Sequence, residues 1–75
     1  MTVREEVSRI MDDFEPRTAR EISQIIKPDA RDYELNILIP QVRSALLICV
    51  KWGEMMKVGE SEEGYRAIIY QKVRA

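Results

Sequence analysis

The chain has 75 residues, of which 45% are hydrophobic and 33% charged, and its 12 basic and 13 acidic residues give a formal net charge of -1. This composition predicts one folded domain covering residues 1–75 and excludes a disordered chain. The near-neutral charge also excludes the strongly basic composition of a nonspecific nucleic-acid coat.

Reactive side chains are few, because the chain has one cysteine and no histidine. This predicts no internal disulfide, no metal site and no cofactor. Cys49 falls among Leu46 and Val50, where a buried thiol is favoured over a nucleophile that no histidine activates. The sequence contains no nucleophile elbow, phosphate-binding glycine loop or paired-carboxylate signature. We therefore expect a protein that is not an enzyme.

The longest continuous apolar run, residues 45–50, is too short to cross a bilayer. The first ten residues, MTVREEVSRI, carry acidic side chains where a secretory signal needs an apolar segment. We expect a cytoplasmic protein that does not bind membranes.

Two helices with matching start signals are predicted in the first third of the chain. Thr2 and Glu5 have the spacing of a capping box, and a helical apolar stripe follows as far as Phe14, so the first helix should end near Glu15, before Pro16. The stripe consists of Val3, Val7, Ile10, Met11 and Phe14. The capping box recurs at Thr18 and Glu21 and predicts a second helix over residues 18–26, which Pro28 terminates.

Residues 28–39 suit two structures, since their apolar residues alternate as in a strand and also fit helical turns. Pro40 is favourable in the first turn of a helix, so a third helix is predicted over residues 40–52 and should end at Gly53. Its core stripe comprises Val42, Ala45, Leu46, Cys49 and Val50, and the other faces comprise Gln41, Arg43, Ser44, Leu47, Ile48 and Lys51.

A hairpin should follow the third helix. Residues 54–58 and 65–73 have strand character, and they flank the polar, glycine-containing loop GESEEG. A two-stranded ribbon is marginal in water, so its apolar side must pack against the helices, with Trp52 placed to fill the corner.

Three helices followed by a hairpin, with VRSALLICVKWGEMMKVG leading into GYRAIIYQKV, resemble the winged helix-turn-helix domains of small prokaryotic transcription regulators over nearly the whole chain. The resemblance implies an α+β fold of three helices with a C-terminal β-hairpin wing. It makes residues 18–26 the supporting helix, residues 40–52 the recognition helix and residues 55–73 the wing.

The chain departs from that family in three places. The connection over residues 27–39 is longer than the usual turn of about three to four residues. Leu47 and Ile48 lie on the presumed DNA face, where burial against residues 28–39 or a second subunit is the favoured interpretation. The third departure is the wing tip, which is acidic through Glu60, Glu62 and Glu63.

Positive charge gathers where this fold would approach a duplex. Residues 17–51 hold six basic and four acidic residues, 6 - 4 = +2, and Arg66, Lys72 and Arg74 add +3 in the tail. A solvated mixed surface would give the same distribution. The order of the elements nevertheless favours DNA.

Our leading hypothesis is therefore a regulator that binds double-stranded DNA. Its candidate base contacts are Gln41, Arg43 and Ser44, and its candidate phosphate contacts are Arg17, Arg20, Lys51 and Arg66. Arg43 has the one specific task, a bidentate bond to a guanine edge, with a surface ion pair as its equal alternative. So small a domain should bind as a homodimer, through Leu47, Ile48, Tyr70 or the last strand. The alternative function is a winged-helix module that binds a protein partner and no DNA.

Overall fold

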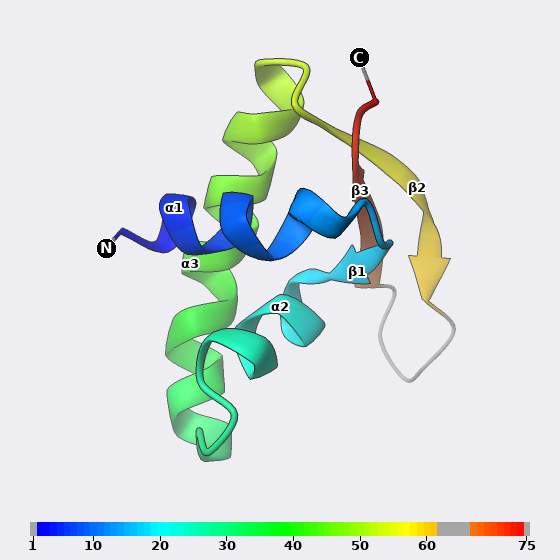
Figure 1. Ribbon diagram of the computed structural model, residues 1–75. Coiled ribbons are helices and arrows are strands. Elements are labelled where there is room, and N and C mark those ends of the chain that lie inside the picture. The colour runs from blue at the N-terminus through cyan, green and yellow to red at the C-terminus, as the bar shows by residue number, and fades with distance from the viewer. Residues whose placement is uncertain (1, 62–66, 75) are drawn as a thin grey trace.

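The computed structural model describes residues 2–61 and 67–74 and shows an α+β fold (Figure 1). In these residues three α-helices and a three-stranded antiparallel sheet occur. In chain order the elements are α1 (Val3–Ile10), the 3-10 turn η1 (Met11–Asp13), β1 (Arg17–Thr18), α2 (Ala19–Ile26), α3 (Asp32–Lys51), β2 (Met55–Ser61) and β3 (Ala67–Lys72).

The starts of the first two helices confirm the predicted caps. At α1 the Thr2 hydroxyl accepts the Glu5 amide at 3.2 Å, which is one half of the predicted capping box, while the Glu5 carboxylate accepts the Thr2 hydroxyl instead of the Thr2 amide. The capping box at α2 is complete, because the Thr18 hydroxyl accepts the Glu21 amide at 3.2 Å and the Glu21 carboxylate accepts the Thr18 amide at 2.9 Å. Both helices therefore begin with amides that side chains satisfy.

The end of the first helix is earlier than predicted. The α-helix stops at Ile10 and tightens into η1, where the Phe14 amide bonds the Met11 carbonyl at 3.1 Å. Phe14 then adopts a left-handed conformation with φ 62°. This reversal, rather than Pro16, ends the helix and turns the chain toward β1.

The start of α3 corrects the predicted boundary at Pro40 and excludes a strand over residues 28–39. Arg31 is extended, its amide is accepted by the Glu34 carboxylate at 3.4 Å, and acidic residues in the first turn suit the positive end of the helix. Pro40 lies inside the helix, and its ring is exposed to solvent. The connection between α2 and α3 is therefore only residues 27–31, and an ion pair between Lys27 and Glu34 spans it.

The core forms where α1, α2 and β2 pack on one stripe of α3, with Tyr70 of β3 completing it, and Figure 1 shows α3 running behind the other two helices. The buried apolar residues here are Val7, Ile10, Met11, Ala19, Ile22, Val42, Ala45, Leu46, Cys49, Met55 and Tyr70. The predicted stripe of the third helix is confirmed by this set, with Val50 partly buried beside it. Burial raises the pKa of the Cys49 thiol, as expected of a structural cysteine.

The sheet has the order β1-β3-β2, so the predicted hairpin is joined by a strand that periodicity does not reveal. β1 is two residues long and pairs Arg17 with Tyr70 and Thr18 with Ile69. In the hairpin the register shifts between Lys57 and Gly59.

The corner between α3 and the hairpin differs from the prediction. Gly53 ends the helix with φ 77°, as expected, but Trp52 is 69% exposed and does not fill the corner. Met55, shortly after this turn, is only 3% exposed, and Tyr70 on β3 is only 2% exposed. Tyr70 is therefore not available for the subunit interface that the sequence suggested.

Candidate nucleic-acid interface

A groove lies between the start of α2, the middle of α3 and the hairpin. Arg20 and Gln24 line it from α2, and Asn36 and Arg43 line it from α3. Its floor is contributed largely by residues of the core and hairpin, namely Ala19, Ile39, Ala67, Ile68 and Tyr70, with Thr18, Glu21, Pro40 and Ser61 completing the lining. Two of the seven predicted DNA contacts, Arg20 and Arg43, thus share one concave surface.

The positions of Arg20 and Arg43 follow from the buried faces of their helices. Ala19 and Ile22 of α2 point into the core, which leaves Arg20 on the solvent side. Arg43 directly follows the buried Val42 and lies at the edge of the core stripe. Within residues 2–61 and 67–74 neither arginine takes part in a hydrogen bond or an ion pair, so both guanidinium groups keep their donors for a ligand.

Two polar residues of the groove were missed in the sequence. Gln24 lies one turn after Arg20 on α2, and Asn36 lies two turns before Arg43 on the same edge of α3. The sequence does not place Asn36 beside Arg43, because residues 28–39 suit both a strand and a helix. In a helix that begins at Asp32, the spacing of seven residues puts the two side chains on the same edge.

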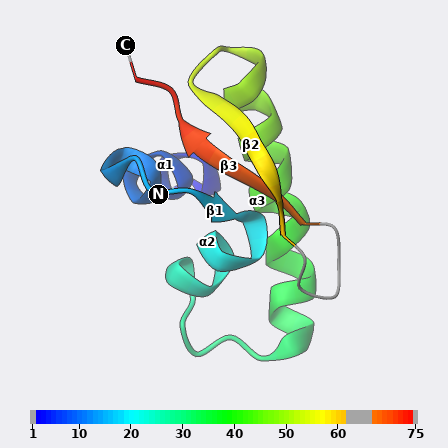
Figure 2. The same ribbon diagram turned by 90° about the vertical axis from the view of Figure 1, so that its right-hand side faces the viewer.

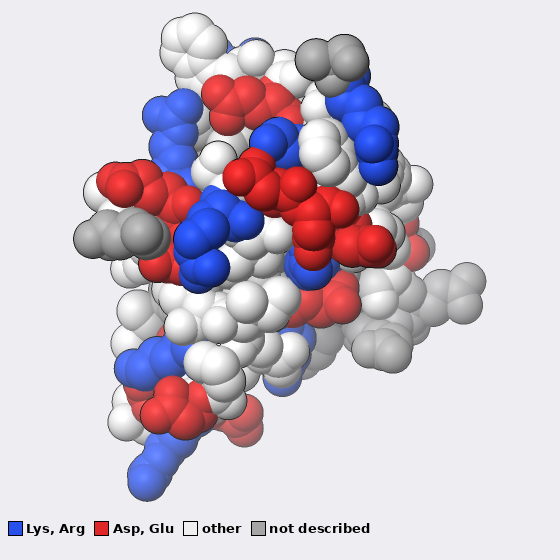
Figure 3. All heavy atoms as spheres, viewed as in Figure 1, with Lys and Arg blue, Asp and Glu red and all other residues white. Residues whose placement is uncertain are grey.

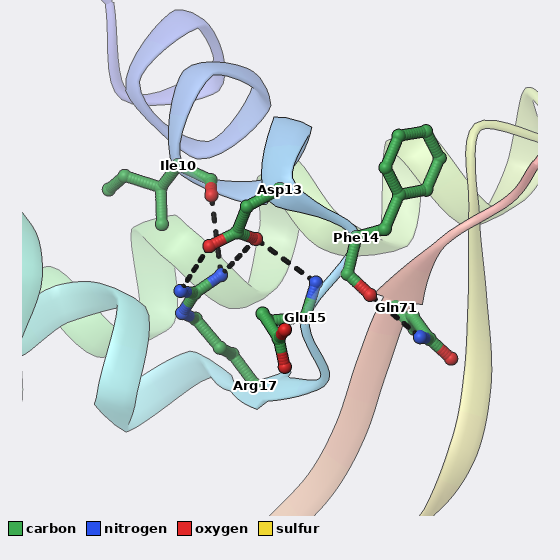
Figure 4. Close-up of polar contacts among 6 residues, drawn as sticks. All are labelled: Ile10, Asp13, Phe14, Glu15, Arg17 and Gln71. Atoms are coloured by element: carbon green, nitrogen blue, oxygen red, sulfur yellow. Dashed lines mark hydrogen bonds and ion pairs between the residues drawn. The ribbon is translucent and has the colours of Figure 1, made fainter.

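Arg17 serves the fold instead of the groove. Its guanidinium donates to both carboxylate oxygens of Asp13, at 2.7 and 2.6 Å, and to the Ile10 carbonyl at 3.3 Å (Figure 4). The hydrogen bond from Arg17 lowers the pKa of Asp13 to about 2, and that bond raises the pKa of Arg17. Arg17 thus joins the end of α1 to β1, and its side chain is only 19% exposed.

The other predicted contacts lie outside the groove. Gln41, Ser44 and Lys51 are exposed on α3 but do not line it. Gln41 precedes Arg43 by two residues, which places it on the far side of the helix, since each residue turns the helix by about 100°. Arg66 lies outside the described residues, as do Glu62 and Glu63 of the predicted acidic wing tip, whereas Glu60 is exposed on β2.

Large apolar side chains are exposed along α3. Leu47 and Ile48 are 46% and 42% exposed, so the expected burial against residues 28–39 does not occur. The reason is geometric, because those residues form the connection and the first turns of the same helix. Tyr33 and Ile37, also exposed, extend this apolar surface toward the start of α3.

Basic residues of the tail are engaged around Phe14. Lys72 pairs with Asp12, and the Arg74 guanidinium lies 4.4 Å from the centroid of the Phe14 ring. The Gln71 side-chain amide donates to the Phe14 carbonyl at 2.7 Å (Figure 4). The positive charge of this segment is thus partly used to hold the end of α1 against β3.

Charge on the α1 side of the molecule is mixed. Figure 3 shows basic and acidic side chains interspersed over this face. Several belong to ion pairs within the chain, such as Arg9 with Glu6 and Arg17 with Asp13. The groove between α2, α3 and the hairpin is therefore the stronger candidate for an anionic ligand.

By length and composition, α3 is apolar enough to cross a membrane, with a mean hydropathy of 1.3, a property it shares with core helices of soluble proteins.

No family model, no curated protein and no solved structure matches the chain.

Proposed function

We propose that the chain is a winged helix-turn-helix regulator of transcription that binds double-stranded DNA in the cytoplasm of a prokaryote. The order of elements supports this, because β1 lies between α1 and α2 and the hairpin β2–β3 joins it in one sheet. The connection of α2 to α3, residues 27–31, is close to the short turn of such domains. In this proposal α2 supports α3, α3 enters the major groove and the hairpin is the wing.

The observation that carries the proposal is the convergence of Arg20 and Arg43, from two helices, on one groove without an acidic partner in the described chain. Arg43 on the recognition helix bonds a guanine edge, whereas Arg20 contacts a phosphate. Gln24 and Asn36 add amide groups of the kind that pair with adenine. Lys51, at the end of α3, remains a proposed phosphate contact. Arg17 is not proposed as one, because its guanidinium binds the Asp13 carboxylate.

Duplex binding over a salt series tests this function. Arg43→Ala should weaken specific binding by about 5- to 100-fold through the lost base contact. Arg20→Ala should lower the slope of log affinity against log salt by about 1, since one phosphate contact is lost. Arg9→Ala is the matched control, because Arg9 lies on α1 in a surface pair with Glu6, and it should leave affinity within about twofold. No wild-type affinity at low salt would reject the proposal.

A second candidate function is favoured by the exposed apolar residues of α3. A helix that presents Leu47 and Ile48 to solvent suits a protein partner better than a phosphate backbone. Under this function the winged-helix scaffold binds protein and no DNA. The same titration separates the two, because the interaction module shows no duplex affinity at any salt concentration.

A further inference from the structure

The outer face of α3 carries a seam formed by Ile37, Gln41, Ser44 and Ile48. The members are spaced by four, three and four residues, which is the spacing of one coiled-coil stripe. All four are exposed, with Ile37 at 63% and Ile48 at 42%. Figure 2 shows α1 and α2 to one side of α3, and the buried residues of the core include none of the four seam residues.

The ends of this seam have opposite charge. Glu34 lies three residues before Ile37, and Lys51 lies three residues after Ile48. Both fall on the same stripe as the seam, because steps of three and four residues keep side chains on one face. Along the helix the stripe is therefore acidic, apolar, polar, polar, apolar and basic. When two copies lie antiparallel, each apolar residue meets an apolar one, each polar residue a polar one, and the acid meets the base.

We propose that the seam binds a second copy of the chain, with the two α3 helices antiparallel about a two-fold axis between residues 42 and 43. In this arrangement Ile37 meets the partner subunit's Ile48, and Gln41 meets the partner subunit's Ser44. Glu34 meets the partner subunit's Lys51. Each contact occurs twice, as an isologous interface requires.

Charge and polarity select this occupant and this orientation. A parallel pair would place Lys51 beside its own copy, which like-charge repulsion disfavours, whereas Glu34 already pairs with Lys27 of its own chain. The polar centre, Gln41 and Ser44, finds hydrogen-bond partners only in another polar surface, and polar residues in a seam fix its register. A bilayer would leave these two groups and Lys51 without partners.

The seam lies away from the groove. Gln41 of the seam is on the far side of α3 from Arg43, so the dimer leaves Arg20 and Arg43 of the groove open. The dimer therefore does not depend on the proposed DNA-binding function, and the two are tested separately.

Sedimentation equilibrium over a concentration series tests the seam, with circular dichroism as the check that each variant is folded. The wild type should move from the mass of one chain, 8.8 kDa, toward twice that value. Ile48→Glu should weaken dimerisation at least about tenfold, because it places a charge against an apolar residue. Ile25→Glu, at a similarly exposed position of α2, should not change it.

A compensating double variant identifies the antiparallel copy as the occupant. Ile37→Lys combined with Ile48→Glu places opposite charges across the axis twice and should restore dimerisation lost in Ile48→Glu. Within one α3 these positions are eleven residues apart and do not touch, so restoration must come from the second chain.

The seam would be overturned by a wild type that keeps the mass of one chain up to about millimolar concentration, by a double variant as monomeric as Ile48→Glu, or by equal loss of dimerisation in Ile25→Glu. Binding of wild type to phosphatidylcholine vesicles, lost in Ile48→Glu, would assign the face to a bilayer and also overturn it. A monomer that binds duplex would reject the seam and keep the DNA proposal, whereas a dimer with no duplex affinity would do the reverse.

Discussion

Arg17 and Arg43 show how the surroundings of one residue type decide its role. Arg17 follows Asp13 by four residues across the reversal at Phe14, so its guanidinium meets a carboxylate that also accepts the Glu15 amide at 3.0 Å. Arg43 has no acid beside it in the described chain and faces the groove. The bidentate pair fixes the first arginine, and the lack of a pair leaves the second one free to bind a ligand.

The Asp13 pair predicts how stability depends on pH at the acid end. The folded-state pKa of Asp13 is about 2, below its ordinary value of 3.8, so its contribution to stability is present above pH 3.8 and is lost as pH falls toward 2. Asp13→Asn should therefore flatten the fall of unfolding free energy between these values, measured by urea titration at each pH. Arg17→Gln should flatten it less, because the Glu15 amide still donates to the Asp13 carboxylate, and the double variant should behave as Asp13→Asn does. If the unfolding free energy of Asp13→Asn fell as steeply with pH as that of the wild type, the pairing would be contradicted.

At the scale of elements, α3 is the helix on which the sequence prediction and the structure differ most. A proline inside a helix removes one hydrogen bond and crowds the preceding turn, so local preference predicts Pro40 in the first turn. The helix continues through it because its ring lies on the exposed side and the buried Leu35 and Val42 lie on either side of it. Burial of the apolar stripe thus outweighs a local preference.

Removal of this proline should stabilise the chain. Pro40→Ala restores an amide able to bond the Asn36 carbonyl, and we expect a gain of roughly 1–2 kcal/mol after the greater freedom of the unfolded chain is counted. Chemical denaturation measures it. Gln41→Ala, the exposed neighbour, is the control and should gain no more than about 0.5 kcal/mol. Equal or lower stability in Pro40→Ala would show that the ring itself is needed in the helix.

The features that could be predicted are those set by local chemistry. The caps at Thr2 and Thr18 and the stop at Gly53 need only nearby atoms, and all three are confirmed. Long-range features could not be predicted in this way. β1 has two residues and forms by pairing with β3, and Trp52 is exposed whereas Met55 and Tyr70 are buried.

The candidate site divides in the same way. The exposure of Arg20 and Arg43 follows from helical periodicity and can be predicted from the sequence alone. Their meeting in one groove depends on how α2 packs against α3, which no local pattern contains. Asn36 was missed for that reason and because its helix was assigned too short.

At the scale of the whole molecule, the net charge is -1, but the basic residues differ in whether they form ion pairs within the chain. Several are paired within the chain, among them Arg9, Arg17, Lys27 and Lys72. Those of the groove are not paired in the described residues. The groove thus brings together Arg20 and Arg43 with one acidic residue, Glu21, in a chain without a strongly basic composition.

Mapping amide chemical shifts by NMR on addition of a short duplex at low salt tests most directly whether this groove binds DNA. We predict that the largest shifts fall on α2 and α3 at Arg20, Gln24, Asn36 and Arg43, and that they shrink as salt is added. The amides of α1 should move little. Shifts confined to α1, or an unchanged spectrum at the lowest salt concentration, would contradict the assignment of the groove to DNA.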